Sequence, residues 1–210
     1  MSTESNFINE LKYDVKKDNI KHFFIRNINS IIAIIFIILV ASIFYMSFNI
    51  YKLNRIQQYN DKIFKIIESE NQKEELKKIY FNSKVPRISK TFAGLNLIAI
   101  LDDNENEMIE KIYNDIFENE KELFFKYYAG LNLLVLKINL NRNTKDIEDL
   151  IKLLENSKNP VLNLVLEQKA LFLKNQGKDE ESKKVFNELL KRDLDKNFTD
   201  RINQYLVNFN

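Results

Sequence analysis

Residues 92–98 read FAGLNLI and residues 128–134 read YAGLNLL, so nearly the same stretch occurs twice at an offset of 36 residues. A further 36 residues lead from Leu134 to Ala170, which lies within VLEQKALFL at residues 165–173. In all three stretches the apolar residues have helical spacing. A period of about 34 residues built from two helices is typical of a helical solenoid, and the sequence therefore predicts one here.

A polar turn follows each of these stretches, and a second helix follows each turn. The turns fall at residues 102–106, 139–144 and 175–179. One hairpin cannot bury its apolar face alone, so we expect neighbouring hairpins to stack. The apolar residues of the second helices are Met108, Ile109, Ile112, Ile116 and Phe117, then Ile147, Leu150, Ile151 and Leu154, then Val185, Phe186, Leu189 and Leu190.

The last hairpin resembles the second half of a tetratricopeptide repeat. Ala170 and Ser182 stand where two helices need small residues in order to touch, and Phe186 stands at the aromatic position. Gly177 is expected to end the first helix at positive φ. In the two earlier repeats Ile98 and Leu134 occupy the small position, and no glycine ends the first helix. A generic helical bundle stays open as the alternative.

Further helices complete the all-α prediction, which the presence of only three Gly and two Pro supports. The helical spacing of Leu53, Ile56, Ile63, Phe64 and Ile67 predicts that a helix continues beyond Asn49 without a break. Other helices are expected from Gln72 to Asn82 and from about Pro86, with a loop at residues 82–84. A helix at residues 198–209 would cap the open end.

Residues 31–48 read IIAIIFIILVASIFYMSF and carry no charge. With Ser30 and Asn49 the stretch reaches about 20 residues, enough to cross the hydrocarbon core. One alternative is the buried core helix of a soluble protein. A cleaved signal peptide is another, but about 30 residues precede the apolar core and no A-x-A-like site follows it. We therefore predict an uncleaved transmembrane helix at residues 30–49, which is in contact with lipid.

The domain organisation follows from this span. Residues 1–29 form a short N-terminal segment, and residues 50–210 form the repeat domain. Five basic residues precede the span and four follow it within a similar distance. The positive-inside rule therefore favours a cytoplasmic N-terminus and a C-terminal domain outside the cytoplasm.

Composition and motifs argue against catalysis. Cysteine is absent, the three glycines do not form a phosphate-binding loop, and His22 is the only histidine. The acidic runs at residues 102–105 and 179–181 fall in turns or at helix N-termini, where carboxylates offset the helix dipole. With 32 Lys+Arg against 30 Asp+Glu there is no global basic field for nucleic acid. We expect a binding module without metal, cofactor or small-molecule substrate.

Taken together, the layout is similar to that of the ancillary SecYEG translocon subunit family, the YfgM-like proteins. The resemblance rests on FFIRN at residues 23–27, the single span, the repeats, ALFLKNQGKD at residues 170–179 and the closing helix. It implies a bacterial inner-membrane protein with a periplasmic repeat domain that associates with the Sec export channel, periplasmic chaperones or export clients. A structural adaptor in a cell-envelope or division complex is the alternative, and a membrane-tethered enzyme is a third possibility.

In such a solenoid the first helices of the repeats would line a groove for extended or helical peptides. With Ala170 at the small position, the 36-residue offset predicts the groove residues of two repeats. They are Tyr128, Leu131, Val135 and Asn139 in one repeat, and Glu167, Leu171, Lys174 and Asn175 in the next.

Overall fold

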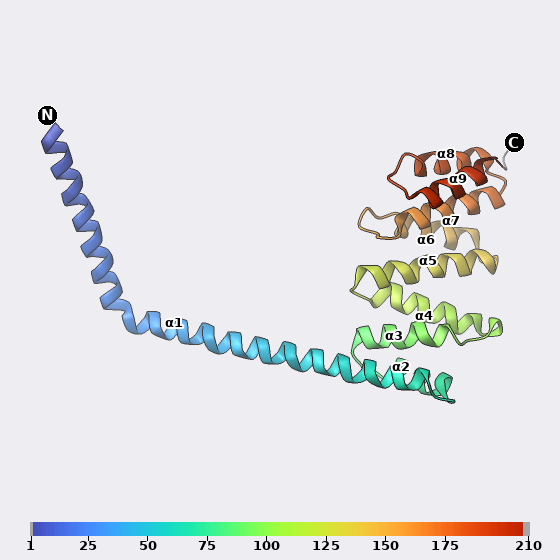
Figure 1. Ribbon diagram of the computed structural model, residues 1–210, viewed down its shortest axis with the longest axis horizontal. Helices are drawn as coiled ribbons and strands as arrows, with labels where there is room; N and C mark the ends of the chain where they lie inside the picture. Colours follow the sequence, from blue (N-terminus) through green and yellow to red (C-terminus); the bar gives the residue numbers. More distant parts are fainter. Residues whose placement is uncertain (1, 208–210) are drawn as a thin grey trace. The chain divides into compact units, whose positions relative to one another are not determined.

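In a computed structural model of the chain, residues 2–207 are described, as are the side chains of residues 34–207 other than Asp103. Every regular element within residues 2–207 is helical, which confirms the all-α prediction (Figure 1). The elements are α1 (Ser2–Ile67), α2 (Gln72–Phe81), α3 (Arg87–Ile98), the 3₁₀ turn η1 (Asp103–Glu105), α4 (Asn106–Asn119), α5 (Leu123–Asn139), α6 (Thr144–Leu154), α7 (Leu162–Asn175), α8 (Asp179–Leu189) and α9 (Lys196–Val207).

The chain divides into two compact units, Met1–Arg55 and Ile56–Asn210. The described residues of the first unit, 2–55, all belong to α1. From Ile34 onward α1 is long and apolar enough to cross a membrane, and none of its most apolar window is buried within the protein. A core helix of a soluble domain would be covered by its neighbours, so this exposure argues against that alternative. As predicted, the helix continues past Asn49 without a break, as far as Ile67.

The second unit is a stack of helices in which consecutive helices run in opposite directions (Figure 1). From α2 to α9, each helix packs against its neighbours in the chain. One end of the stack, here named the Ile56 end, holds the connections α2–α3, α4–α5, α6–α7 and α8–α9. Ile56 lies at this end because its carbonyl accepts from the Ser89 hydroxyl, near the start of α3, at 3.4 Å. The opposite end, the Gly177 end, holds the connections α1–α2, α3–α4, α5–α6 and α7–α8.

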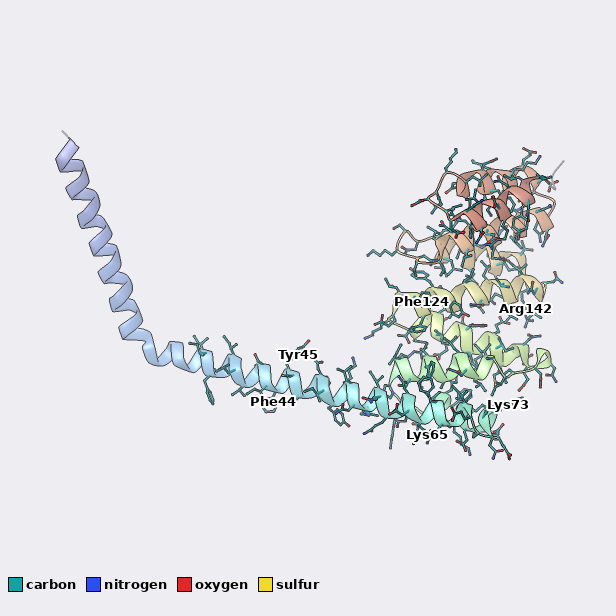
Figure 2. The ribbon with its side chains drawn as sticks, viewed as in Figure 1. Phe44, Tyr45, Lys65, Lys73, Phe124 and Arg142 are labelled. Atoms are coloured by element: carbon teal, nitrogen blue, oxygen red, sulfur yellow. The ribbon has the colours of Figure 1, made fainter. Side chains whose placement is uncertain are left out.

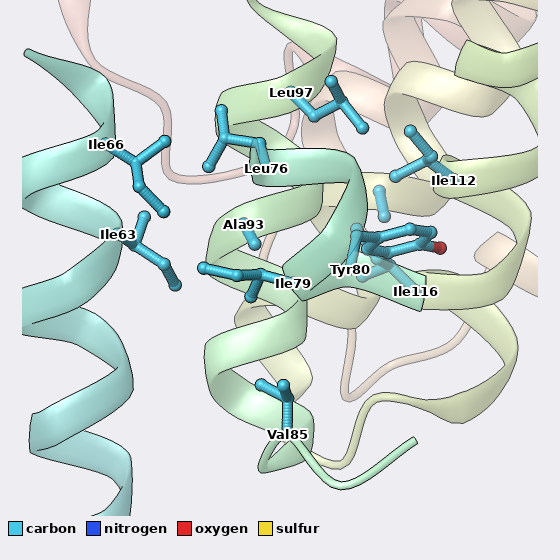
Figure 3. Close-up of a cluster of buried hydrophobic side chains, with 11 residues drawn as sticks. Ile63, Ile66, Leu76, Ile79, Tyr80, Val85, Ala93, Leu97, Ile112 and Ile116 are labelled. Atoms are coloured by element: carbon cyan, nitrogen blue, oxygen red, sulfur yellow. The ribbon is translucent and has the colours of Figure 1, made fainter. Parts of the chain in front are cut away.

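Three clusters of buried apolar side chains succeed one another along the stack. In the first, Ile63 and Ile66 of α1 face Leu76 and Ile79 of α2 (Figure 3). The second cluster joins α5, α6 and α7, and the third joins α7, α8 and α9. Each fully buried aliphatic side chain contributes about 1.5–3 kcal/mol through burial. The apolar core is therefore continued from one neighbour to the next.

The repeated AGLN sequence has the same structural role in α3 and in α5. Gly94 lies so close to its neighbours that a Cβ atom would stand 2.9 Å from the Tyr80 ring of α2 and 3.0 Å from Ile112 of α4. A Cβ atom on Gly130 would stand 2.7 Å from Phe117 of α4 and 2.6 Å from Leu154 of α6. Both glycines thus allow one helix to approach the helix before it and the helix after it.

The 36-residue period also appears in the backbone of two turns. Gly177 has φ 72°, and the Lys178 N–H donates to the Leu173 carbonyl at 2.9 Å. Thirty-six residues earlier Asn141 has φ 50°, and the Arg142 N–H donates to the Lys137 carbonyl at 3.0 Å. This pattern is the left-handed C-terminal cap of a helix. No glycine ends α5, but Asn141 adopts the same conformation.

The last hairpin follows the predicted small-residue contacts. Ala170 and Ser182 are fully buried, and the Ser182 Oγ donates to the Ala170 carbonyl at 2.7 Å. Phe186 is also buried and stacks against Tyr205 of α9, with ring centroids 5.4 Å apart. As expected, a final helix, α9, packs beside α8 and covers the last hairpin. It begins at Lys196 and not at residue 198. Residues 208 and 209 of the predicted helix lie outside the described range.

Helix pairing differs from the prediction in the first two repeats. The sequence paired the helix at residues 92–98 with the following helix. In the structure α3 packs most extensively on α2, and α5 on α4, while α7 packs on α8 as predicted. The physical reason is the position of the small residues. Ile98 and Leu134, which correspond to Ala170, are bulky, and the small residue that permits close approach is Gly94 or Gly130 one turn earlier, where it contacts the preceding helix as well as the following one.

Candidate interaction surface

A stripe of exposed or half-buried side chains runs along one face of α5 and contains three of the predicted groove residues. It consists of Phe124, Tyr128, Val135 and Asn139, whose spacing of four, seven and four residues places them on one helix face. Phe124 and Tyr128 are 55% and 39% exposed, and their rings stack with centroids 6.0 Å apart. Phe124 lies at the Ile56 end of α5, and Arg142 lies just beyond the other end of this helix (Figure 2). These four residues are named the α5 stripe.

The opposite face of α5 is held in the core, which fixes the orientation of the stripe. Tyr127, Gly130, Leu133 and Leu134 are buried there. Leu131, the fourth predicted groove residue of this helix, is 9% exposed and belongs to the second core cluster. The structure thus separates Leu131 from the other three predicted residues of α5.

The corresponding ring in α3 is half-buried. Phe92, which precedes Tyr128 by 36 residues, packs against Phe64 of α1 with ring centroids 5.3 Å apart. Tyr128 instead stacks on Phe124 of its own helix and keeps part of its ring accessible. The repeat therefore presents on α5 an aromatic position that α1 covers on α3.

Buried polar contacts hold the beginning of α5. Glu120 is buried and accepts a short hydrogen bond from the Thr91 hydroxyl of α3. The other oxygen of this carboxylate accepts the backbone N–H groups of Lys121 at 2.7 Å and of Glu122 at 3.2 Å. Because the N–H groups at the start of a helix need partners, Glu120 stabilises the turn that carries Phe124.

The other end of α5 is tied to α4 by an ion-pair network. Glu110 of α4 accepts from Lys137 at 2.7 Å and from Arg142 at 3.1 Å. The hydrogen bond from Lys137 is the largest influence on Glu110, and it holds the pKa of this carboxyl below its usual value despite partial burial. Both ends of the α5 stripe thus rest on fixed backbone.

A second polar network joins α2, α3 and α4. Asp115 accepts from the Tyr80 hydroxyl at 2.7 Å and from Arg87 at 3.0 Å. Burial opposes ionisation of Asp115, but the hydrogen bonds from Tyr80 and Arg87 outweigh it and lower its pKa. Burial, together with the bond to Asp115, raises the pKa of Tyr80 far above its usual value.

On α7 the structure places the predicted residues in different surroundings. Glu167 is 4% exposed and accepts two hydrogen bonds from Arg201 of α9, at 2.7 and 3.0 Å. Leu171 is half-buried against the third core cluster, and Lys174 is half-buried as well. Glu167 therefore joins α9 to α7, and reversing its charge would disturb the fold as well as any surface around it.

Asn175, the last predicted residue, lines a shallow pocket at the Gly177 end. The pocket has a volume of about 230 Å³. Ile138 and Phe172 form part of its wall, and Asn141 and Arg142 stand in the turn beside it. The amide and guanidinium groups could donate hydrogen bonds to a backbone carbonyl or a carboxylate.

Sequence reasoning missed Phe124, the most exposed ring of the stripe. Its signal was present, because Phe124 precedes Tyr128 by four residues and so lies on the same helical face. Among the side chains described, no three His, Asp or Glu residues are grouped as metal ligands would be. His22 lies outside the described side chains.

The chain was compared with protein-family models, with curated proteins and with solved structures, and none of them matches it.

Proposed function

We propose that this protein is a membrane-anchored protein–protein interaction module, with a tetratricopeptide-like solenoid that binds its partner along the α5 stripe. The stacked aromatic pair Phe124 and Tyr128 carries the proposal. Both rings are exposed, yet they stand on a helix whose other face and both ends are fixed. Rigid aromatic side chains supply large contact area at low entropic cost, and they are enriched where protein interfaces gain most of their energy.

The anchor explains how such a module would act. Residues 30–49 hold the chain in the membrane, so the stack meets membrane partners at a raised effective concentration. The layout shared with YfgM-like proteins supports a partner in protein export at the bacterial inner membrane, with the stack in the periplasm. On this proposal the partner is the Sec channel, a periplasmic chaperone or an export client.

Site-specific photo-crosslinking tests the proposal in the full-length protein in its own membranes. A photoreactive residue at position 128 is compared with one at Asn187, an exposed position on α8. Position 128 is expected to give a defined crosslinked band containing an export-channel subunit, a chaperone or a client, and position 187 is expected not to give it. Partners from envelope synthesis or division would instead support the structural adaptor.

A matched pair of variants separates binding from folding. Phe124→Ala combined with Tyr128→Ala should weaken partner capture at least about tenfold, because interface aromatics commonly contribute 2 kcal/mol or more. The control Phe81→Ala removes an aromatic side chain of similar exposure at the end of α2. The proposal is wrong if both variants capture the crosslinked partner as well as the native chain does.

A further inference from the structure

Residues 195–199 read DKNFT and match the acceptor sequence for an N-linked glycan. Oligosaccharyltransferases act on Asn-x-Ser/Thr, in which the middle residue is any except proline. Of all the asparagines in the chain, only Asn197 is followed two positions later by Ser or Thr. Asp195 also places an acid two residues before the acceptor, which the bacterial enzymes of this class require. The motif therefore meets the stricter bacterial requirement as well as the general one.

The structure places the acceptor on the surface, where the connection α8–α9 runs into the last helix. Lys196 is the first residue of α9, and Asn197 follows it with an exposed side chain. Asp195 is also exposed, and Thr199 is half-buried. A glycan is bulky and hydrophilic, so the side chain that carries it must stand in solvent, as that of Asn197 does.

Local hydrogen bonds hold the motif in the first turn of α9. The Asp195 carboxylate accepts the Phe198 N–H at 2.9 Å. The Asp195 carbonyl accepts the Thr199 hydroxyl and the Thr199 N–H, both at 3.0 Å. Asp195 is thus the N-cap of α9, and capping gives it a structural role that any test of the acceptor sequence must separate from recognition by an enzyme.

The acceptor stands at the edge of the fold, where it can leave the helix without disturbing the stack. The first turn of a helix opens readily, because its N–H groups lack partners within the helix. Within Lys196–Val207, the buried side chains of α9 are those of Phe198 and Ile202. Opening of the first turn breaks the three hydrogen bonds at Asp195 and uncovers Phe198, while Ile202 keeps the rest of α9 in the third core cluster.

We propose that Asn197 is a site of N-linked glycosylation by a membrane-bound oligosaccharyltransferase, with a polyprenyl-pyrophosphate-linked oligosaccharide as the donor. The Asn197 Nδ2 attacks the anomeric carbon of the first sugar and forms a C–N bond. The bond from that carbon to the pyrophosphate oxygen breaks, the lipid pyrophosphate leaves, and Nδ2 gives up one proton. The inference rests on the proposed location of the stack outside the cytoplasm, because these enzymes transfer glycans on that side of the membrane.

The test uses the full-length chain, produced in bacterial cells that contain an oligosaccharyltransferase and its lipid-linked oligosaccharide. Glycosylation is measured by the shift in gel mobility and is located by mass spectrometry of the peptide around residue 197. The native chain is expected to gain a glycan at Asn197, and Asn197→Gln is expected to lose it. Asn203→Gln removes an exposed asparagine from the same helix and should be glycosylated as the native chain is.

Substitutions on either side of Asn197 separate recognition by the enzyme from helix capping. Asp195→Asn keeps a good N-cap but removes the charge. It should slow glycosylation about tenfold or more, because a charge-assisted hydrogen bond to the enzyme is lost. Thr199→Ser keeps the hydroxyl and should be glycosylated, whereas Thr199→Val should not be. Circular dichroism of the purified variants checks that each one is folded.

A second acceptor sequence distinguishes the two ways in which the expected result can fail. Asn106→Thr, combined with Asn197→Gln, makes the exposed Asn104 an acceptor with Asp102 two residues before it. If Asn104 is glycosylated in this variant but Asn197 is not glycosylated in the native chain, the inference is wrong and the proposed location stands. If neither is glycosylated in cells that modify a standard acceptor protein, the location and the inference fall together. Native-like glycosylation of Thr199→Val would also overturn the inference.

Discussion

Gly130 shows why the AGLN sequence recurs. A Cβ atom there would stand 2.6–2.9 Å from Leu154 and Phe117, which are side chains of the two neighbouring helices. Helix propensity alone would favour alanine by about 1 kcal/mol. Overpacking of a core typically costs about 1–3 kcal/mol, and contacts this short to two neighbouring helices place the cost in the upper half of that range, so the steric term should win.

We therefore expect Gly130→Ala to lower the free energy of unfolding by about 1–2 kcal/mol, and Gly130→Ser to lower it further. Urea denaturation of both variants, followed by circular dichroism, measures the change. An unchanged or raised unfolding midpoint for Gly130→Ala would show that α5 does not approach α4 and α6 this closely.

Substitution of Asn141 tests whether the turn after α5 has the left-handed conformation of the turn at Gly177. Its φ of 50° is costly for an ordinary L-residue but accessible to glycine and asparagine. Asn141→Ala should destabilise the protein by about 1 kcal/mol or more, whereas Asn141→Gly should stay within about 0.5 kcal/mol of the native chain. Thermal melting of the two variants compares them. Equal losses for alanine and glycine would contradict a left-handed cap at this turn.

At the scale of elements, Asp115 couples helix packing to pH. Its carboxylate accepts bonds from α2 and α3, and its pKa is lowered in the folded state. A carboxyl with a depressed folded pKa contributes stability that is fully present above its unfolded pKa, near 3.9, and is lost as the pH falls through the folded value.

Asp115→Asn should therefore flatten the fall in stability on the acid side of about pH 4 and lower stability at neutral pH. Denaturation midpoints from neutral to acidic pH measure both effects. Lys145→Gln, an exposed substitution on α6, is a suitable control. A variant whose midpoint falls with acid as steeply as that of the native chain would exclude Asp115 as a source of the acid sensitivity.

Most helices could be predicted because their apolar residues recur with helical spacing and their ends carry polar turns. The helix predicted from Gln72 to Asn82 is found at Gln72–Phe81, and the contact between Ala170 and Ser182 is confirmed. The pairing of α3 with α2 could not be predicted from the offset, because the offset aligned Ile98 and Leu134 with Ala170, whereas the close contacts with the preceding helix are made at Gly94 and Gly130. The burial of Glu167 was also missed, because the residue that pairs with it, Arg201, lies 34 residues away in the chain and no local pattern connects the two.

At the scale of the whole molecule, the two units have two different kinds of helical surface. The described part of the first unit exposes Ile, Phe and Leu on all sides, as a helix in lipid does. The second unit buries one face of each helix and exposes charge on the others. The proposed anchor requires the apolar surface of the first unit to lie in lipid. The proposed binding surface requires the second unit to fold in water.

Alkaline carbonate extraction of membranes that contain the full-length chain tests this division most directly. A matched variant with Ile37→Lys, Val40→Lys and Phe44→Lys places three charges in the span; each charge costs about 2.5–3.5 kcal/mol at the centre of a membrane helix. The account predicts that the native chain stays in the membrane pellet while the variant is released as a folded helical protein. Release of the native chain into the alkaline supernatant would contradict it.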